Sequence, residues 1–231
     1  MIIYFLIGVP VFIVLLTVTG RLEKRMVWPY GTPEAQPQFR DGSGYATQRV
    51  GEALEAGFSF FGWSADLKGP RYQISYGLMA SPERDCFAVI GVGKVLSVRI
   101  RGTWIFTRAT DGKVIYTTDN QACVEVDASR RWRGQLVRAR TFTELLQRHR
   151  ALLRDYAVMV QPFAVGREID EFRSIREEHY HAMSREGLIV FTDGAAAHWR
   201  YTFWGALKFA ALSYSIGLVR ALTFGRIPRV A

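Results

Sequence analysis

The stretch YQISYGLMASPERDCFAVIGVGKVLSVRIRGTWIFTRATDGKVIYT, residues 72–117, decides the fold of this chain. Residues 72–78 and 95–107 alternate polar and apolar side chains, which is typical of half-buried strands. Residues 86–92 form a continuous apolar run, which indicates a strand buried on both faces or central in a sheet. Asp111-Gly112 predicts a hairpin turn before residues 114–117, because that turn needs positive φ. We therefore expect an antiparallel meander of four strands, with residues 123–126 as a fifth.

Helical patterns surround this meander. Residues 141–144 read Thr-Phe-Thr-Glu, a capping box that opens a helix whose inward-facing stripe includes His149 and extends to Tyr156. A second helix is expected over residues 168–185, followed by a small hairpin from residues 188–191 and 198–201. A short helix over residues 48–56 precedes an aromatic cluster that we expect to close the core. The sequence thus predicts an α+β fold, with an antiparallel four- to five-stranded sheet packed with helices. The aromatic cluster consists of Phe58, Phe60, Phe61 and Trp63.

Residues 1–20, MIIYFLIGVPVFIVLLTVTG, carry no charged side chain. About 20 apolar residues are enough to cross a bilayer, so this run predicts an N-terminal transmembrane helix. Nothing basic precedes the run and bulky charged residues follow it, which favours a retained helix over a cleaved signal peptide. Arg21, Lys24 and Arg25 flank only its C-terminal end. The positive-inside rule therefore predicts a single-pass protein with its N-terminus outside and its domain in the cytoplasm.

The C-terminal residues 203–222 are also largely apolar, but Lys208 interrupts the run and Arg220 lies near its end. A second crossing would place Arg220 and the arginines after it outside, against the positive-inside rule. A helix lying in the interface, with Lys208 reaching toward water, fits the charges better. A core helix of the soluble domain is the third alternative, and we expect membrane contact of one of the first two kinds.

These patterns divide the chain into five expected segments. The first is the anchor at residues 1–20, and residues 21–46 form a linker rich in proline and glycine. Residues 47–161 form the cytoplasmic α+β domain, residues 162–202 a helix-hairpin unit, and residues 203–231 an apolar membrane-associated helix and tail. Cys86 and Cys123 are too few for a disulfide framework and would stay reduced in the cytoplasm.

No pattern in the sequence predicts a catalytic, cofactor or metal site. Gly91-Val92-Gly93-Lys94 lacks the earlier glycine and the following Ser or Thr of a phosphate loop. His179 and His181 are two residues apart on the second helix, so they point to different sides and do not form a metal pair. The polar side chains that could meet in a cavity between sheet and helices are Arg101, Asp119, Asn120 and His149.

The strongest polar signal is a basic run in a chain with net charge +9 and a pI near 9.8. Glu144 is the only acidic residue between Ala128 and Arg154. Such a surface suits anionic lipid headgroups, an acidic protein partner or nucleic acid. Tryptophans are frequent anchors at interfaces. The expected partner or lipid surface comprises Arg130, Arg131, Arg133, Arg138, Arg140, Arg148, Trp28, Trp63, Trp132 and Trp204.

Three functions follow from these features. The first is a membrane-anchored, non-catalytic interaction protein, an accessory or scaffold subunit that contacts other membrane-complex subunits and anionic lipid headgroups. The second is a membrane-tethered enzyme or a domain that binds a small ligand or lipid. The third is a tethered nucleic-acid binder, for which residues 185–189 and 199–202 resemble the end of a winged-helix domain. The helix pair that should precede that end is not evident, so we expect no nucleic-acid partner.

Overall fold

The structure is a computed structural model that describes residues 24–25, 44–67, 72–95, 98–120, 132–193 and 198–208. The chain divides into two compact units. Within the described residues, the larger unit holds those from 44 to 120 and from 132 to 176, and the smaller unit holds those at 24–25, 177–193 and 198–208. The expected anchor, most of the linker, the expected strand at 123–126 and the segment beyond residue 208 lie outside the described residues.

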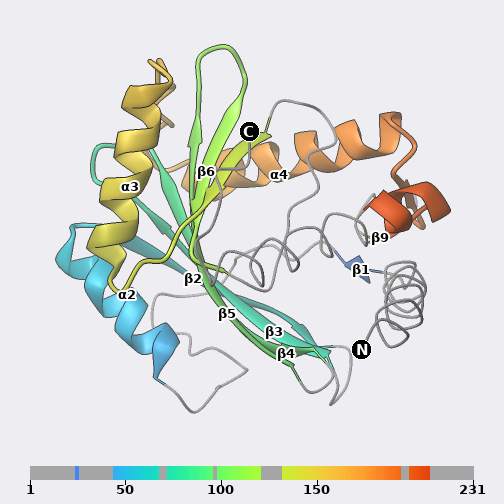
Figure 1. The fold of residues 1–231 in the computed structure, drawn as a ribbon, viewed down its shortest axis with the longest axis horizontal. Coiled ribbons are helices and arrows are strands. Elements are labelled where there is room, and N and C mark those ends of the chain that lie inside the picture. The colour runs from blue at the N-terminus through green and yellow to red at the C-terminus, as the bar shows by residue number, and fades with distance from the viewer. Residues whose placement is uncertain are drawn as a thin grey trace, which may run out of the picture. The chain divides into compact units, whose positions relative to one another are not determined.

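A six-stranded sheet forms the centre of the larger unit (Figure 1). All neighbours from β2 to β6 are antiparallel, whereas β7 runs parallel to β6. The predicted α+β class is confirmed, but the expected four or five antiparallel strands were wrong, because the sheet is mixed and has six. In spatial order the strands are β2 (Ser59–Leu67), β3 (Tyr72–Ala80), β4 (Phe87–Val95), β5 (Val98–Arg108), β6 (Val114–Thr118) and β7 (Trp132–Leu136).

Strand β2 contains Phe60, Phe61 and Trp63 of the aromatic cluster, which was expected to close the core but not to form a strand. Its register with β3 shifts between Phe60 and Gly62, which marks a β-bulge. A bulge breaks the alternation that identifies strands, so the pattern did not predict this one. The cluster nevertheless joins the core, since the Phe58 ring meets Phe142 edge-on at 4.9 Å between centroids.

Helices α2 (Tyr45–Glu55) and α3 (Phe142–Asp155) cover one face of the sheet (Figure 1). The expected cap begins α3, because the Thr141 hydroxyl accepts a hydrogen bond from the Glu144 backbone N–H at 3.1 Å. Burying apolar side chains between helix and sheet supplies most of the stability of such a layer. The buried residues of this layer are Ala53, Phe58, Met79, Cys86, Ala88, Ile90, Ile105, Phe142, Leu145 and Leu146.

The opposite face packs against the first half of α4 (Glu168–Arg185) and the loop before it. Phe87 of β4 stacks on Phe163 at 4.2 Å and meets Phe172 of α4 edge-on at 5.6 Å. The ring centroids of Phe106 on β5 and Trp132 on β7 lie 5.5 Å apart. The sheet is therefore buried by side chains on both faces in this region.

The smaller unit contains the predicted hairpin, formed by β8 (Ile189–Phe191) and β9 (His198–Tyr201). A short strand, β1 (Lys24–Arg25), pairs with β9, so the strand order is β1-β9-β8. Met183, Ile189 and Trp199 are buried in this unit. Within the described part of the chain, no helix is both long and apolar enough to cross a membrane.

Candidate functional site

The most distinctive surface of the larger unit is basic and lies along β7, the β7–α3 connection and α3. Residues 132–160 contain six arginines and no lysine, and their only acidic residues are Glu144 and Asp155. Arg150 alone among the six forms an ion pair with a described residue, Glu83, at 3.3 Å. We define the other five as the basic surface; all are exposed, and their positions are Arg133, Arg138, Arg140, Arg148 and Arg154.

Local contacts fix this surface to the sheet. β7 pairs with β6 in a register that places Arg133 beside Ile115. The Gln135 side-chain amide donates to the Thr117 hydroxyl at 3.2 Å and to the Arg148 carbonyl at 3.0 Å, so it joins β7, β6 and α3. The Glu144 carboxylate accepts from the Arg140 backbone N–H at 2.9 Å. The basic surface is therefore held on β7, on α3 and on a connection whose backbone is hydrogen-bonded to β6 and α3.

A shallow depression of about 280 Å³ lies at one end of the basic surface. The β5–β6 turn, β7 and the loop after α3 line it, with Lys113, Arg133, Tyr156 and Met159 among the lining residues. The Arg133 guanidinium lies 5.7 Å from the Tyr156 ring centroid, within the range of a cation–π contact. The depression therefore combines cationic and apolar groups.

The structure places the predicted surface residues in different environments. Arg133, Arg138, Arg140 and Arg148 are exposed and lie on the basic surface. Trp204 is 70% exposed, as an interface residue should be, but it belongs to the smaller unit. Three further residues of the expected surface lie outside the described residues, and these are Trp28, Arg130 and Arg131.

Two of the expected tryptophan anchors face inward instead. Trp132 is only 4% exposed and packs against Phe106 and Tyr116, so it occupies a core position and not the exposed surface expected for a docking residue. Trp63 is partly buried and packs against the core under α2 and α3. Successive side chains on a strand point to opposite faces of the sheet, which explains why Trp132 is buried whereas its neighbour Arg133 is exposed.

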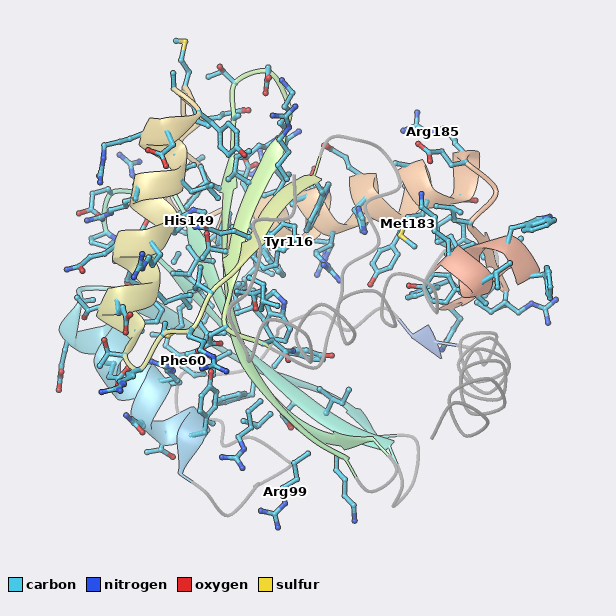
Figure 2. All side chains as sticks on the ribbon, in the orientation of Figure 1. Phe60, Arg99, Tyr116, His149, Met183 and Arg185 are labelled. Carbon is cyan, nitrogen blue, oxygen red and sulfur yellow. The ribbon has the colours of Figure 1, made fainter. Side chains whose placement is uncertain are left out.

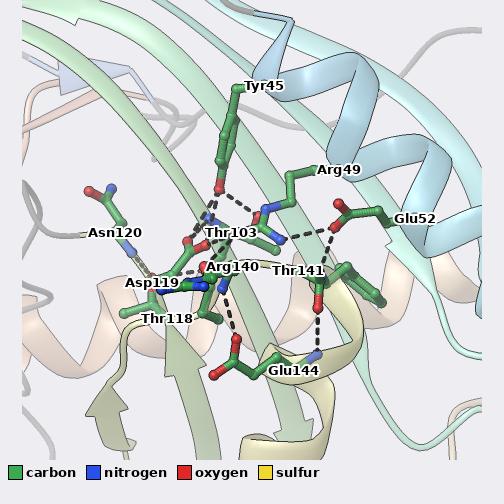
Figure 3. Close-up of polar contacts among 12 residues, drawn as sticks. Tyr45, Arg49, Glu52, Thr103, Thr118, Asp119, Asn120, Arg140, Thr141 and Glu144 are labelled. Atoms are coloured by element: carbon green, nitrogen blue, oxygen red, sulfur yellow. Dashed lines mark hydrogen bonds and ion pairs between the residues drawn. The ribbon is translucent and has the colours of Figure 1, made fainter.

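A buried polar cluster joins α2 to the sheet (Figure 3). The Arg49 guanidinium donates to Asp119 at 2.8 Å and to Glu52 at 3.0 Å. The Tyr45 hydroxyl lies 2.9 Å from the Thr103 hydroxyl and donates to Asp119 at 3.3 Å. Every one of these groups is engaged with another, so the cluster fixes the helix to the sheet.

The pKa values in this cluster follow from burial. Burial raises the pKa of Asp119 above its usual value, although the Thr103 backbone N–H, Arg49 and Tyr45 act in the opposite direction. Burial and the Asp119 carboxylate raise the pKa of Tyr45 to about 12. Tyr45 therefore keeps its proton at neutral pH and is a poor general base.

His149 lies on the sheet-facing side of α3 (Figure 2) and is fully buried. Its Nε2 lies 2.9 Å from the Thr107 hydroxyl, and its Nδ1 lies 3.0 Å from the Thr117 hydroxyl. Thr107 donates its own proton to the Asp85 carbonyl, so it accepts from Nε2–H and the neutral ring accepts from Thr117 at Nδ1. Burial lowers the pKa of His149 to about 3.

The four residues expected to meet in a cavity do not share one site. Asp119 belongs to the Arg49 cluster, His149 to the threonine pair, and Arg101 is exposed. Asn120 is buried against Gly102. In the described part of the chain, no three acidic, histidine or cysteine side chains are arranged to hold a metal ion.

Some residues of these sites were not predicted. Arg49 had a usable signal, because it occupies the buried stripe of α2 between Ala46 and Ala53 at helical spacing. Lys113, Tyr156 and Met159 come from two separate loops, and no spacing in the sequence relates them.

Comparison of the chain with protein-family models, curated proteins and solved structures found no match.

Proposed function

We propose that this chain is a non-catalytic interaction protein at a membrane, an accessory or scaffold subunit of a larger membrane protein complex. The observation that carries the proposal is the basic surface, whose five arginines form no ion pair with any described residue. Like charges held together repel one another, and an acidic partner surface would relieve that repulsion. Their placement on β7, on α3 and on the hydrogen-bonded connection between them favours a docking surface over a mobile basic tail.

The interior favours this proposal over a tethered enzyme. An acid–base site needs titratable groups within reach of one another and of a substrate. Asp119 and His149 lie in separate clusters, and each is fully engaged in hydrogen bonds. These groups therefore serve the packing of α2 and α3 against the sheet.

The membrane part of the proposal rests on the sequence of residues 1–20, which has the length and hydropathy of an anchor. A tether holds the basic surface near the membrane, where acidic surfaces of membrane proteins and anionic headgroups are concentrated. The arginines then add orientation and association rate to a contact that the anchor has already localised.

The test is extraction of the full-length chain from its native membrane in mild detergent, followed by pull-down and mass spectrometry. We expect the native chain to copurify with other membrane proteins in stoichiometric amounts. A triple variant of the basic surface should lose these partners. Glutamine keeps a polar side chain and removes the charge, so the fold should survive. The triple variant combines Arg138→Gln, Arg140→Gln and Arg148→Gln.

A matched control neutralises three exposed arginines elsewhere: Arg99→Gln, Arg167→Gln and Arg200→Gln. Both variants lower the formal net charge from +9 to +6, so they differ only in which arginines are lost. The control should retain the partners. Recovery of the native chain as a lone monomer would contradict the proposal, and so would equal loss of partners in the two variants.

Nucleic acid is the other partner that a basic surface could serve. Binding to duplex DNA would weaken steeply with salt, because counterions are released on binding. We expect no measurable binding of the detergent-solubilised chain to duplex DNA at low salt. Tight, strongly salt-dependent binding would favour the nucleic-acid alternative over the accessory-subunit proposal.

A further inference from the structure

The depression at the end of the basic surface differs from the rest of that surface because it is concave. Ile115 of β6 forms part of its floor, Arg133 of β7 lies beside Ile115, and Lys113 comes two residues before it. Lys113 is the last residue of the β5–β6 turn, directly before β6, and both Lys113 and Arg133 line the depression. The depression therefore has two cations at its sheet side.

The balance of charge in the depression is positive. Lys113 is ion-paired with Asp111, and it holds the pKa of Asp111 below the usual value. Arg133 has only the Tyr156 ring as a described partner. The last carbonyls of α3 accept from the backbone N–H groups of residues 156–158, so the negative end of the helix is satisfied within the chain. An anion would thus meet Arg133 first and would compete with Asp111 for Lys113.

The other side of the depression is apolar and open to solvent. Met159 is 72% exposed and Tyr156 is 47% exposed. The Met159 backbone is nevertheless fixed, since its carbonyl accepts from the Thr110 N–H at 2.9 Å. A flexible thioether on a fixed backbone adapts to irregular apolar ligands.

We propose that this depression binds the phosphate headgroup of an anionic phospholipid, with Arg133 and Lys113 on the phosphate and Met159 against the first part of the acyl chains. The pairing of cations with an exposed apolar side chain matches an amphiphile. A water-soluble phosphate ester would leave Met159 without a role. The binding uses none of the three arginines varied in the pull-down, so the two proposals can fail independently.

The test uses the full-length chain in nonionic detergent, with isotope-labelled methionine methyl groups observed by NMR. The chain has five methionines, and Met159→Leu identifies the Met159 signal by its loss. Titration with dihexanoyl phosphatidylglycerol should shift the Met159 signal to saturation. Met79 and Met183 are buried, and their unchanged signals would show that the fold is intact.

Variants of the cationic side separate a headgroup site from a merely apolar one. Lys113→Gln and Arg133→Gln should each weaken binding by roughly fivefold, as expected for one basic residue near an anionic lipid. Asp111→Asn should tighten binding severalfold, because it removes the competing carboxylate. It keeps the oxygen that accepts from the Lys113 backbone N–H at 3.0 Å, so the turn is preserved.

Three outcomes would overturn the proposal. The first is no shift of Met159 with phosphatidylglycerol while the buried methionine signals remain native. The second is equal binding of dihexanoyl phosphatidylcholine, which would make the depression an apolar contact without headgroup recognition. The third is equally tight binding of glycerol phosphate, which would indicate a soluble phosphate ester as the ligand.

Discussion

His149 shows how one buried side chain can make the stability of the fold depend on pH. Its pKa is about 3 in the folded chain and about 6.5 in the usual environment. Between these values the unfolded chain binds a proton that the folded chain does not, so stability falls as pH falls through this window. The largest slope is about 1.4 kcal/mol per pH unit.

We expect His149→Gln to flatten the pH dependence of the free energy of unfolding between about pH 6.5 and 5, where most carboxylates stay ionised. Chemical unfolding followed by tryptophan fluorescence measures this slope. The control is His181→Gln, which removes an exposed histidine of α4 by the same substitution. A slope that persists in His149→Gln would assign the pH dependence to other groups.

The Arg49–Asp119 ion pair gives a second prediction. The side chains are 5% and 9% exposed, so removing Arg49 leaves the buried Asp119 carboxylate without its cationic partner. We expect Arg49→Met to lower the free energy of unfolding by about 3 kcal/mol. Adding Asp119→Asn should recover part of this loss, because a neutral amide costs less to bury. Additive losses in the double variant, measured by chemical unfolding, would contradict a coupled pair.

The sequence predicted on which side of a helix His149 lies, but it did not predict the partners of His149 and Arg49. The apolar stripe of α3 correctly included His149, because spacing along one helix is visible in the sequence. Its threonine partners lie on β5 and β6, and Asp119 is 70 residues from Arg49. Such partners are set by how strands and helices meet, which no local pattern encodes.

Glycines set the spacing between elements in this sheet. A Cβ at Gly134 of β7 would overlap the Tyr116 ring of β6, whereas a Cβ at Gly51 of α2 would meet nothing within 4 Å. We expect Gly134→Ala to lower the free energy of unfolding by about 1–3 kcal/mol through overpacking. Gly51→Ala should raise it by up to about 1 kcal/mol, because alanine favours the helix. Thermal unfolding compares the two, and a stabilised Gly134→Ala would show that β7 moves at little cost.

The same features explain which elements were predicted. The side chains of β3, β5, α3 and α4 follow the periodicity of their elements, whereas β4 is marked by a continuous apolar run and β6 by the Asp111-Gly112 turn before it. β2 carries a bulge, and β7 is a short strand with Gly134 at its centre and parallel pairing to β6. Parallel pairing needs a crossover rather than a tight turn, so no hairpin signal precedes β7.

Across the whole chain, we expect partner binding to depend more on where the positive charges are concentrated than on their total. Residues 132–160 have six arginines and two acids, which accounts for four of the nine net positive charges. The sequence predicted this basic surface because arginines close along the chain remain close on β7 and α3. It did not predict the depression, since Lys113, Arg133 and Met159 come together only through the β5–β6 turn and the loop after α3.

The last prediction concerns the salt dependence of the complex that we propose. Exposed charges more than about 10 Å apart are largely screened at 0.1 M salt, so a contact through the basic surface should weaken as salt rises. We expect the native complex to dissociate faster and form more slowly at higher salt, as measured by surface-immobilised binding of the purified partner. The triple variant at Arg138, Arg140 and Arg148 should bind weakly with little salt dependence. The control at Arg99, Arg167 and Arg200 has the same net charge of +6 and should keep the native salt dependence. If net charge alone governed binding, the two variants would behave alike, and the basic surface would have no special role.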